Sequence, residues 1–570
     1  MNRRQVLQAA AAASFATASN LLVAETPTQT GDSRYKALFP QLDRFVAQFM
    51  RDMRAPGMTL VLADRDGTQR VATYGLGDRE ARIAVKPEEL FQIGSISKSF
   101  LGLCLLQLHD EGKLDLHRPI HEYLPWWRLD SSHAPITAHH MLTHGTGLPS
   151  PDSPMTSDPS QRHKAVHAPG EHFHYNNMVY ETLGYLAETL DGRQLPQIIR
   201  ARVLEPLGMT ASEPVITLDM RERLVKSYSS FQGDRPLPRN GRLCEAPGIV
   251  ITSGSGCVAS TPADMGKYLR MIASGGVGPR GRLISQKSFE LFTTSHILTG
   301  PEGGGPDVGY GYGLFIDKLD GHRLVRHTGG MVSFASSMMV DVDSGVAAFS
   351  SINAMQGYRP SPVMLYALQL MNATRESKPL PAVPASVSPT AIDDAKDYAG
   401  TFTSGKRSLQ FAAEGKSLFL VHGGARVELE AAGEPGHFLV LHRDFNRYTL
   451  VFGRRKADDP SSPVTEVSWG PDWYTNAAYD GPREFDAPGE WQSYVGHYRN
   501  ESPWLGSLRI VLRKGVLLVD GVTPLERVGD AFYLRDEPHN PEWIRFGEVV
   551  NGRCMRIKFS GNDLWRVAAA

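Results

Sequence analysis

The chain has 570 residues, which is too many for one compact hydrophobic core and indicates two to four domains. Apolar residues make up 41% of it and charged residues 21%, as in ordinary soluble globular proteins. Because 60 Lys and Arg residues nearly balance 61 Asp and Glu residues, the net charge is only -1, and neither nucleic acid nor an anionic membrane surface is an expected partner.

Residues 1–24 have the composition of an export signal. Arg3 and Arg4 precede an Ala-rich apolar stretch that ends in the Ala-x-Ala pattern of a cleavage site. The paired arginines favour the twin-arginine type, with cleavage after Ala18 or Ala24. The apolar stretch is too short to span a membrane, and no later segment runs 18 apolar residues. We therefore expect a periplasmic or secreted protein, the alternative being a disordered cytoplasmic tail.

Residues 35–375 mix strands and helices and predict the first large domain. Strands over 58–63 and 70–74 flank an Asp-Gly turn, which predicts a β-hairpin. The segment 100–111 is apolar on nearly all sides, as expected of a helix buried at the centre of a domain. The remaining predicted elements are helices over 179–190 and 262–273 and strands over 313–316, 334–342 and 347–352. This order predicts a sheet flanked by helices and closed by strands from both ends of the domain.

The last third of the chain has a different character. A segment over 376–392, with four prolines between Lys378 and Pro389, predicts a stiff, extended linker. Short alternating runs with Gly and Asp turns then indicate an all-β tail. Tyr398-Ala-Gly-Thr-Phe is echoed 96 residues later by Tyr494-Val-Gly-His-Tyr. We therefore expect two similar β-barrels, over 393–485 and 486–570, since closure hides edge strands; sandwiches are the alternative.

The four cysteines do not indicate a metal site. None of them forms a Cys-x-x-Cys pair, so a zinc site of that kind is not expected. Cys244 and Cys257 would be able to pair in an oxidising compartment, but free and mostly buried thiols are the default expectation.

A serine and a lysine lie three residues apart where the buried helix begins. Positions i and i+3 share one face of a helix, so Ser95 and Lys98 are expected to be neighbours. Burial disfavours the ammonium form, and a neutral Lys98 would be able to take the proton of Ser95. The helix N-terminus adds positive potential near a developing oxyanion. Ser33 and Lys36 have the same spacing but lie in a polar stretch, and we assign them no role.

Two further motifs follow this pair along the chain. The three motifs, in order, are Ser95-Ile96-Ser97-Lys98, Tyr175-Asn176-Asn177 and His327-Thr328-Gly329. They resemble the ordered triple of the serine β-lactamase and penicillin-binding-protein family. Connecting segments over 136–149, 169–171 and 205–209 are similar to the class C branch of that family, so the resemblance covers roughly residues 40–372. It implies an α/β (α+β) β-lactamase/transpeptidase-like domain with a central antiparallel sheet flanked by helices.

The resemblance also implies a reaction, which is acyl transfer in two steps without a metal or an organic cofactor. Ser95 would attack a carbonyl carbon, while Lys98 and Tyr175 would share the acid and base work. The remaining implied roles are an oxyanion hole from the backbone N–H groups of Ser95 and Gly330, and substrate binding by Asn177, His327, Thr328 and Gly329. Tyr-x-Asn recurs in the β tail at Tyr474 and Tyr498, where we assign it no role.

The substrate is less well determined than the chemistry. His327 replaces the lysine of most β-lactamases and carboxypeptidases and is mostly neutral at pH 7, which weakens carboxylate anchoring. Two β-barrels after the catalytic domain resemble the layout of D-aminopeptidases, so we favour a D-stereospecific peptidase, aminopeptidase or amidase acting on a peptide or small molecule. The alternatives are a carboxylesterase, a D-Ala-D-Ala carboxypeptidase or β-lactamase, and a non-catalytic binding protein. The chain has no Gly-x-Ser-x-Gly motif, which argues against an α/β-hydrolase.

Overall fold

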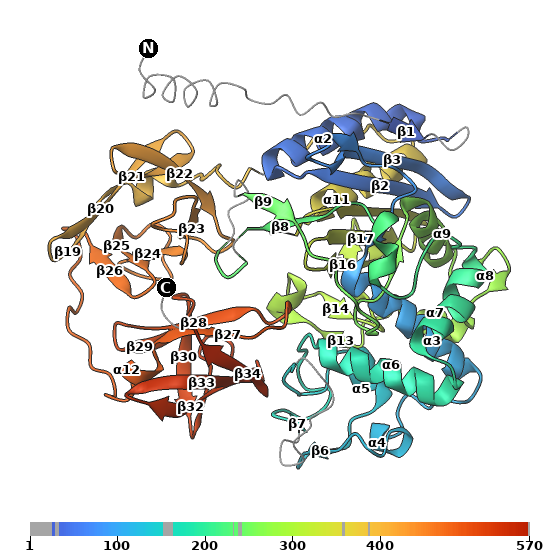
Figure 1. The fold of residues 1–570 in the computed structure, drawn as a ribbon. Coiled ribbons are helices and arrows are strands. Elements are labelled where there is room, and N and C mark those ends of the chain that lie inside the picture. The colour runs from blue at the N-terminus through green and yellow to red at the C-terminus, as the bar shows by residue number, and fades with distance from the viewer. Residues whose placement is uncertain are drawn as a thin grey trace.

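The computed structural model describes residues 26–28, 33–151, 163–231, 233–236, 242–355, 359–385 and 388–567. It contains one large domain built on an antiparallel sheet and two closed β-barrels, which confirms the predicted fold class (Figure 1). The export signal predicted over 1–24 lies outside the described residues. Within those residues, every helix is too short or too polar to cross a bilayer.

The large sheet is closed by strands from opposite ends of the first domain. Its order is β1-β3-β2-β18-β17-β16-β15-β14-β13, with β4 paired to β3. The strands are β1 Thr26–Thr28, β2 Gly57–Asp64, β3 Gly67–Asp78, β4 Ile83–Ala84, β13 Ile297–Leu298, β14 Gly309–Tyr310, β15 Phe315–Leu319, β16 His322–Gly330, β17 Ala335–Asp341 and β18 Val346–Ile352. The predicted hairpin is β2 and β3, and β18 pairs antiparallel with β2 along its whole length.

Helices cover both faces of this sheet. The side chains of β2 alternate between two cores, so that Leu60 packs with α2 (Phe39–Met53) and α11 (Ser361–Arg375), and Val61 packs with α3 (Ser97–Asp110) and α9 (Pro262–Ala273). The other helices are α4 Ile120–Tyr123, α5 Ala138–Leu142, α6 Asn177–Asp191, α7 Leu195–Ile199, α8 Glu205–Leu207, α10 Gln286–Phe292 and α12 Trp491–Tyr494. Short 3-10 turns are η1 Lys36–Leu38, η2 Gly94–Ile96, η4 Leu218–Glu222, η5 Gly300–Gly303 and η6 Ala395–Tyr398, and a π-helical turn is η3 Arg200–Leu204.

Helix α3 runs through the middle of the domain, as its composition predicts. Its residues from Ser97 to Leu106 are all buried, and it begins three residues before the predicted start. The strand predicted over 313–316 is present but begins later and runs further, as β15 from Phe315 to Leu319, because a turn after β14 takes up Gly313 and Leu314. Gly313 has φ +92°, a left-handed conformation that breaks a strand, and its Cα faces the backbone of Lys98 closely.

Small two-stranded sheets complete the first domain. They are formed by β5 Phe91–Gln92 with β10 Ala259–Ser260, β6 Leu129–Asp130 with β7 His163–Lys164, β8 Tyr228–Ser230 with β9 Leu243–Glu245, and β11 Val277–Gly278 with β12 Gly281–Arg282. Figure 1 shows β8 and β9 on the side of the domain that faces the barrels.

Each half of the tail is an eight-stranded closed barrel, so closure rather than a sandwich hides the strand edges. The first consists of β19 Gly400–Ser404, β20 Arg407–Glu414, β21 Ser417–His422, β22 Ala425–Ala431, β23 His437–Val440, β24 Leu450–Arg454, β25 Val464–Trp469 and β26 Asp472–Thr475. The second consists of β27 Gly496–Arg499, β28 Ser507–Arg513, β29 Val516–Val519, β30 Thr523–Val528, β31 Ala531–Leu534, β32 Trp543–Val550, β33 Arg553–Phe559 and β34 Asn562–Arg566. The sequence echo marks equivalent places, since Tyr398 and Tyr494 each end a short helix just before the first strand.

The predicted linker is docked on the first domain. Leu380 and Val383 pack against the core formed by α2 and α11, and the Tyr366 hydroxyl donates to the Pro381 carbonyl at 3.1 Å. From Pro389 onward the chain belongs to the first barrel, because the Pro389 carbonyl accepts from a barrel amide at 2.7 Å. The proline-rich segment therefore contacts the first domain at one end and the first barrel at the other.

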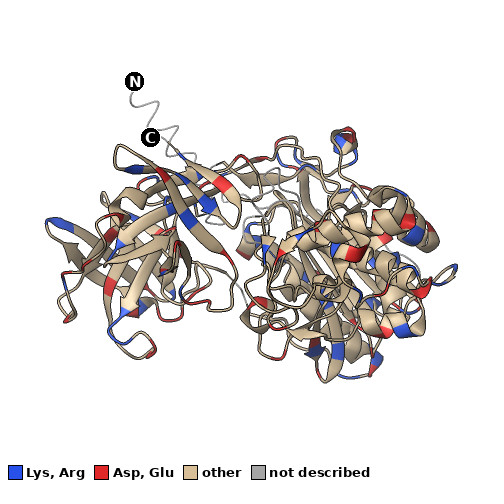
Figure 2. Ribbon diagram, turned by 90° about the horizontal axis from the view of Figure 1, so that it is seen from below, with Lys and Arg blue, Asp and Glu red and all other residues tan. Residues whose placement is uncertain are grey.

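The barrels also contact the first domain directly. Asp234 and Arg509 form an ion pair at 2.5 Å, and Arg235 donates to Asn446 at 2.7 Å. Acidic and basic residues are interspersed over both parts on the face seen in Figure 2. All four cysteines are free thiols, and Cys244 and Cys257 are not paired.

Candidate active site

Ser95 and Lys98 are neighbours, as their spacing predicts. Ser95 lies in the 3-10 turn η2 and Lys98 in the first turn of α3, fully buried. The Lys98 amine lies 3.1 Å from the Ser95 hydroxyl oxygen, and it donates to Asn177 Oδ1 at 2.7 Å and to the Ser255 carbonyl at 2.9 Å. The first two motifs thus meet at one amine, which aims directly at the serine oxygen.

The surroundings of Lys98 favour its neutral form. Burial lowers the pKa of the amine well below its ordinary value, and its three hydrogen-bond partners are uncharged: a hydroxyl, an amide oxygen and a carbonyl. A neutral amine donates to two of them and presents its lone pair to the third, Ser95. A free amine can accept the proton of Ser95 near neutral pH, whereas an ammonium cannot.

Tyr175 lies beside Ser95 and, in contrast to Lys98, its environment favours the protonated form. Burial raises the pKa of its hydroxyl, and the nearby Ser95 hydroxyl lowers it only in part. The hydroxyl is buried and has no hydrogen-bond partner at normal distance among the described residues. Its ring centroid lies 4.8 Å from the Lys98 amine. An unpartnered phenol at the cavity wall can serve as a proton donor to a bound group.

The third motif forms the end of β16 and lines the same cavity. His327 is buried, and Nδ1 lies 2.6 Å from the Thr328 carbonyl while Nε2 lies 3.0 Å from the Tyr310 hydroxyl. Because a carbonyl only accepts, the proton sits on Nδ1, and Nε2 accepts from Tyr310. Burial and the nearby Lys98 lower the pKa of His327 to about 3. The ring is therefore neutral, in line with the sequence-based expectation.

Glycines let β16 run against the nucleophile turn. A Cβ on Gly329 would lie 1.9 Å from the Ile93 carbonyl, and a Cβ on Gly94 would lie 2.8 Å from the Gly330 nitrogen. Gly94 also has φ +56°, a left-handed conformation. This close approach puts Gly330 and Ser95 on the wall of one cavity, as an oxyanion hole would require.

Sequence reasoning missed several supporting residues. Asn176 caps α6 by accepting from the Val179 amide, and it donates to the carbonyls of Leu148 and Pro149. His144, which the sequence left without a role, accepts from the Asn176 amide at 3.0 Å and packs 4.4 Å from the Tyr175 ring. Asn176 could have been found, because it lies inside the second motif. The Ser255 carbonyl, which accepts from Lys98, could not, because every residue has a backbone carbonyl and its position depends on the fold.

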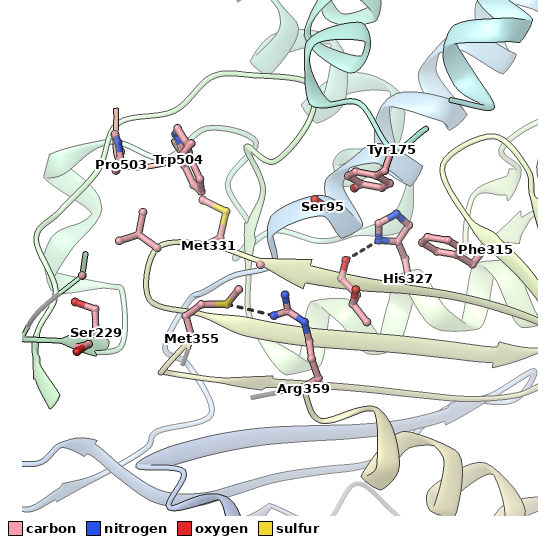
Figure 3. A pocket seen from close by; sticks show the side chains of 15 residues that line it. Ser95, Tyr175, Ser229, Phe315, His327, Met331, Met355, Arg359, Pro503 and Trp504 are labelled. Atoms are coloured by element: carbon pink, nitrogen blue, oxygen red, sulfur yellow. Dashed lines mark hydrogen bonds between the residues drawn. The ribbon is translucent and has the colours of Figure 1, made fainter. Parts of the chain in front are cut away.

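The cavity has a volume of about 620 Å³ and is shared by two domains (Figure 3). Its apolar wall includes Phe315, Met331 and Met355, and Arg359 adds a guanidinium. Trp504, from the loop between β27 and β28 of the second barrel, also lines it. Figure 3 shows Ser95, Tyr175 and His327 turned toward one another, with Trp504 across the opening.

The cavity does not offer a set of metal ligands. Among its described lining residues, His327 is the only side chain of the His, Cys, Asp or Glu type. A group with suitable spacing, formed by His422, His442 and Asp444, lies in the first barrel, away from this cavity.

Comparisons with known proteins agree with this geometry. The family model described as Beta-lactamase matches residues 42–371. Protein flp of Staphylococcus aureus (strain N315) is 24% identical over 357 residues, which cover 59% of this chain and 67% of that protein. The D-alanyl-D-alanine-carboxypeptidase/endopeptidase AmpH of Escherichia coli (strain K12) is 23% identical over 329 residues, which cover 54% of this chain and 82% of AmpH. The octameric penicillin-binding protein homologue from Pyrococcus abyssi has a similar fold, with a TM-score of 0.54 and 24% identity over 77% of this chain and 98% of its own.

Proposed function

The chain belongs to the beta-lactamase family, and from that premise we propose that it is a serine hydrolase that cleaves amide or ester bonds through an acyl-enzyme on Ser95. One observation carries the proposal. A buried lysine amine, whose hydrogen-bond partners are neutral oxygens, lies 3.1 Å from the hydroxyl of a half-exposed serine at a cavity wall.

The opposite pKa shifts of the two side chains assign the proton transfers. Lys98 takes the proton of Ser95 as Oγ bonds to the substrate carbonyl carbon. The negative charge on the carbonyl oxygen is held by the N–H groups of Ser95 and Gly330, and one such donor contributes about 2.7–4 kcal/mol. As the C–N or C–O bond breaks, Tyr175 gives its proton to the leaving group and regains one from Lys98. Water then attacks the acyl-enzyme by the reverse sequence and restores Ser95.

Within this chemistry, we favour D-stereospecific peptidase, aminopeptidase or amidase activity. Two features support it: the β-barrels after the catalytic domain, and the likeness to AmpH, which is named for action on D-alanyl-D-alanine. A carboxylesterase is the second candidate, because the neutral His327 supplies no fixed charge for a substrate carboxylate and the wall is largely apolar. The export signal predicted for residues 1–24 would place either activity in the periplasm or outside the cell.

A substrate panel tests the choice. Wild-type protein and the Ser95→Ala variant are compared on D- and L-aminoacyl p-nitroanilides, p-nitrophenyl esters and a chromogenic β-lactam. We expect kcat/KM for D-aminoacyl amides to exceed that for the L enantiomers, and Ser95→Ala to be inactive. Turnover confined to esters would favour the esterase, and turnover confined to the β-lactam would overturn both candidates.

A further inference from the structure

A carboxylate of the second barrel reaches the segment that carries Tyr175. Glu542 lies between β31 and β32, and its Oε1 accepts from His174 Nε2 at 2.8 Å and from the Ser150 amide at 2.8 Å. The side chains of His174 and Glu542 are only 11% and 10% exposed. The contact therefore joins two domains through a buried pair directly beside Tyr175 in the chain.

The same histidine is linked to the Tyr175 backbone on its other side. His174 Nδ1 lies 3.5 Å from Glu302 Oε1, and Glu302 Oε2 accepts from the Tyr175 amide at 3.1 Å. Burial lowers the pKa of His174, but the nearby carboxylates of Glu302 and Glu542 outweigh burial and raise it to about 9. The imidazolium thus lies between two carboxylates, one from each domain.

Contacts on both sides fix the path of this segment. His144 holds the opposite side, since its carbonyl accepts from the His174 amide at 3.0 Å and its Nδ1 accepts from the Asn176 amide at 3.0 Å. The Tyr175 hydroxyl itself has no hydrogen-bond partner among the described residues. The position of the phenol therefore depends on the packing of its ring on His144 and on its backbone, which contacts Glu302 directly and Glu542 only through His174.

We propose that Glu542 of the second barrel is a positioning residue for Tyr175, and that it acts through His174. The proposal rests on the function proposed above, because it concerns the Tyr175 hydroxyl as proton donor. It gives the second barrel a role in catalysis beyond lining the cavity with Trp504. Removing the Glu542 charge leaves His174 with a buried positive charge that Glu302 alone must balance, so the segment shifts.

The test is the turnover of the best amide substrate of the panel by the full-length chain, because its leaving amine needs the Tyr175 proton, whereas the fluoride that leaves a fluorophosphonate does not. The Glu542→Gln variant is expected to lower kcat about 10- to 100-fold, as a displacement of about 1 Å at a reacting group can do. KM should stay within about twofold, because Glu542 does not line the cavity. The matched control is Glu526→Gln, an exposed glutamate on β30 of the same barrel, which should turn over the substrate like the wild type.

The His174→Gln variant and the double variant with Glu542→Gln separate positioning from general loss of folding. His174→Gln should slow turnover to a similar extent, and the double variant should be no slower than either single variant, since each of the three variants removes the same His174–Glu542 contact. Thermal unfolding of each variant checks that the protein is folded under the conditions of the assay. If Glu542→Gln does not fold, the effect of His174→Gln on the rate decides whether the proposal holds. Wild-type rates in both single variants, or effects that multiply, would overturn the proposal. A wild-type protein that a fluorophosphonate never labels would instead refute the proposed function.

Discussion

The Lys98 amine can act as a base because its hydrogen-bond partners among the described residues are neutral oxygens. They belong to Ser95, Asn177 and Ser255, and no carboxylate is among them to stabilise the ammonium. Burial alone then lowers the pKa of the amine. At the scale of single residues, the site is a serine with a proton acceptor on one side and an unpartnered phenol on the other.

Replacing Lys98 by arginine should abolish the base while keeping a long basic side chain. A guanidinium does not lose its proton in proteins, so it cannot accept one from Ser95. We expect the rate at which a fluorophosphonate labels Ser95 to fall about 10²- to 10⁴-fold, the usual contribution of a general base. The control is Lys113→Arg, a surface lysine paired with Glu111 at 2.9 Å, which should change nothing. A Lys98→Arg variant as fast as the wild type would remove Lys98 from the role of base.

Some residues of the site can be predicted from the sequence and others cannot. Ser95 and Lys98 could be predicted because their spacing directly encodes a shared helix face. The roles of Glu302 and Glu542 could not, because they follow Tyr175 by more than a hundred residues and carry no local pattern. Only the fold brings them to His174.

At the scale of elements, the site depends on how closely β16 approaches the turn η2. Gly329 has no room for a side chain, since a Cβ there would lie 1.9 Å from the Ile93 carbonyl, a rigid backbone atom. The end of β16 also carries Gly330, the second expected oxyanion donor. The absence of a side chain at Gly329 therefore lets the backbone N–H of Gly330 lie close to Ser95.

Gly329→Ala should push β16 away from the turn and weaken the oxyanion hole. We expect kcat to fall about 10²- to 10³-fold, the effect of losing one donor. The measurement is steady-state kinetics on the best substrate of the panel. Gly547→Ala is the matched control, because Gly547 lies in strand β32 with open space around its Cα. Equal losses in both variants would mean that the approach of β16 to η2 is not what matters.

Periodicity predicted the elements well where the chain follows one pattern throughout. The helix over 262–273 matches α9, and the echo of Tyr398 at Tyr494 marks equivalent starts of the two barrels. The strand predicted over 313–316 begins two residues late, as β15, because Gly313 turns the chain there to pass the backbone of Lys98. This contact joins residues far apart in the sequence, so the hydrophobic periodicity of the local segment cannot predict it.

At the scale of the whole molecule, the barrels and the first domain contact each other at several places. The linker packs on α2 and α11, Asp234 pairs with Arg509, and Trp504 enters the wall of the cavity. The pair of His174 and Glu542 adds a buried ionic contact between domains.

This last contact makes stability depend on pH in a defined direction. Against the opposing effect of burial, Glu302 and Glu542 together raise the pKa of His174 in the folded protein from 6.5 to about 9, so this charged cluster contributes stability that is complete below about pH 6.5 and is lost as the pH rises through about 9. The difference corresponds to about 3 kcal/mol, of which the Glu542 contact supplies a part. Glu542→Gln should therefore lower the thermal unfolding midpoint more at pH 6.5 than at pH 10, while Glu526→Gln should lower it at neither. A deficit of Glu542→Gln that is equal at both pH values would contradict the assignment.

The acyl-enzyme chemistry on Ser95 is tested most directly by the mass of the protein after treatment with a fluorophosphonate, first intact and then after proteolytic digestion. We expect one adduct per chain, on the peptide that contains Ser95, and none in the Ser95→Ala variant. An adduct that persists in Ser95→Ala would place the nucleophile elsewhere, and a wild-type protein without any adduct would contradict the acyl-enzyme chemistry altogether.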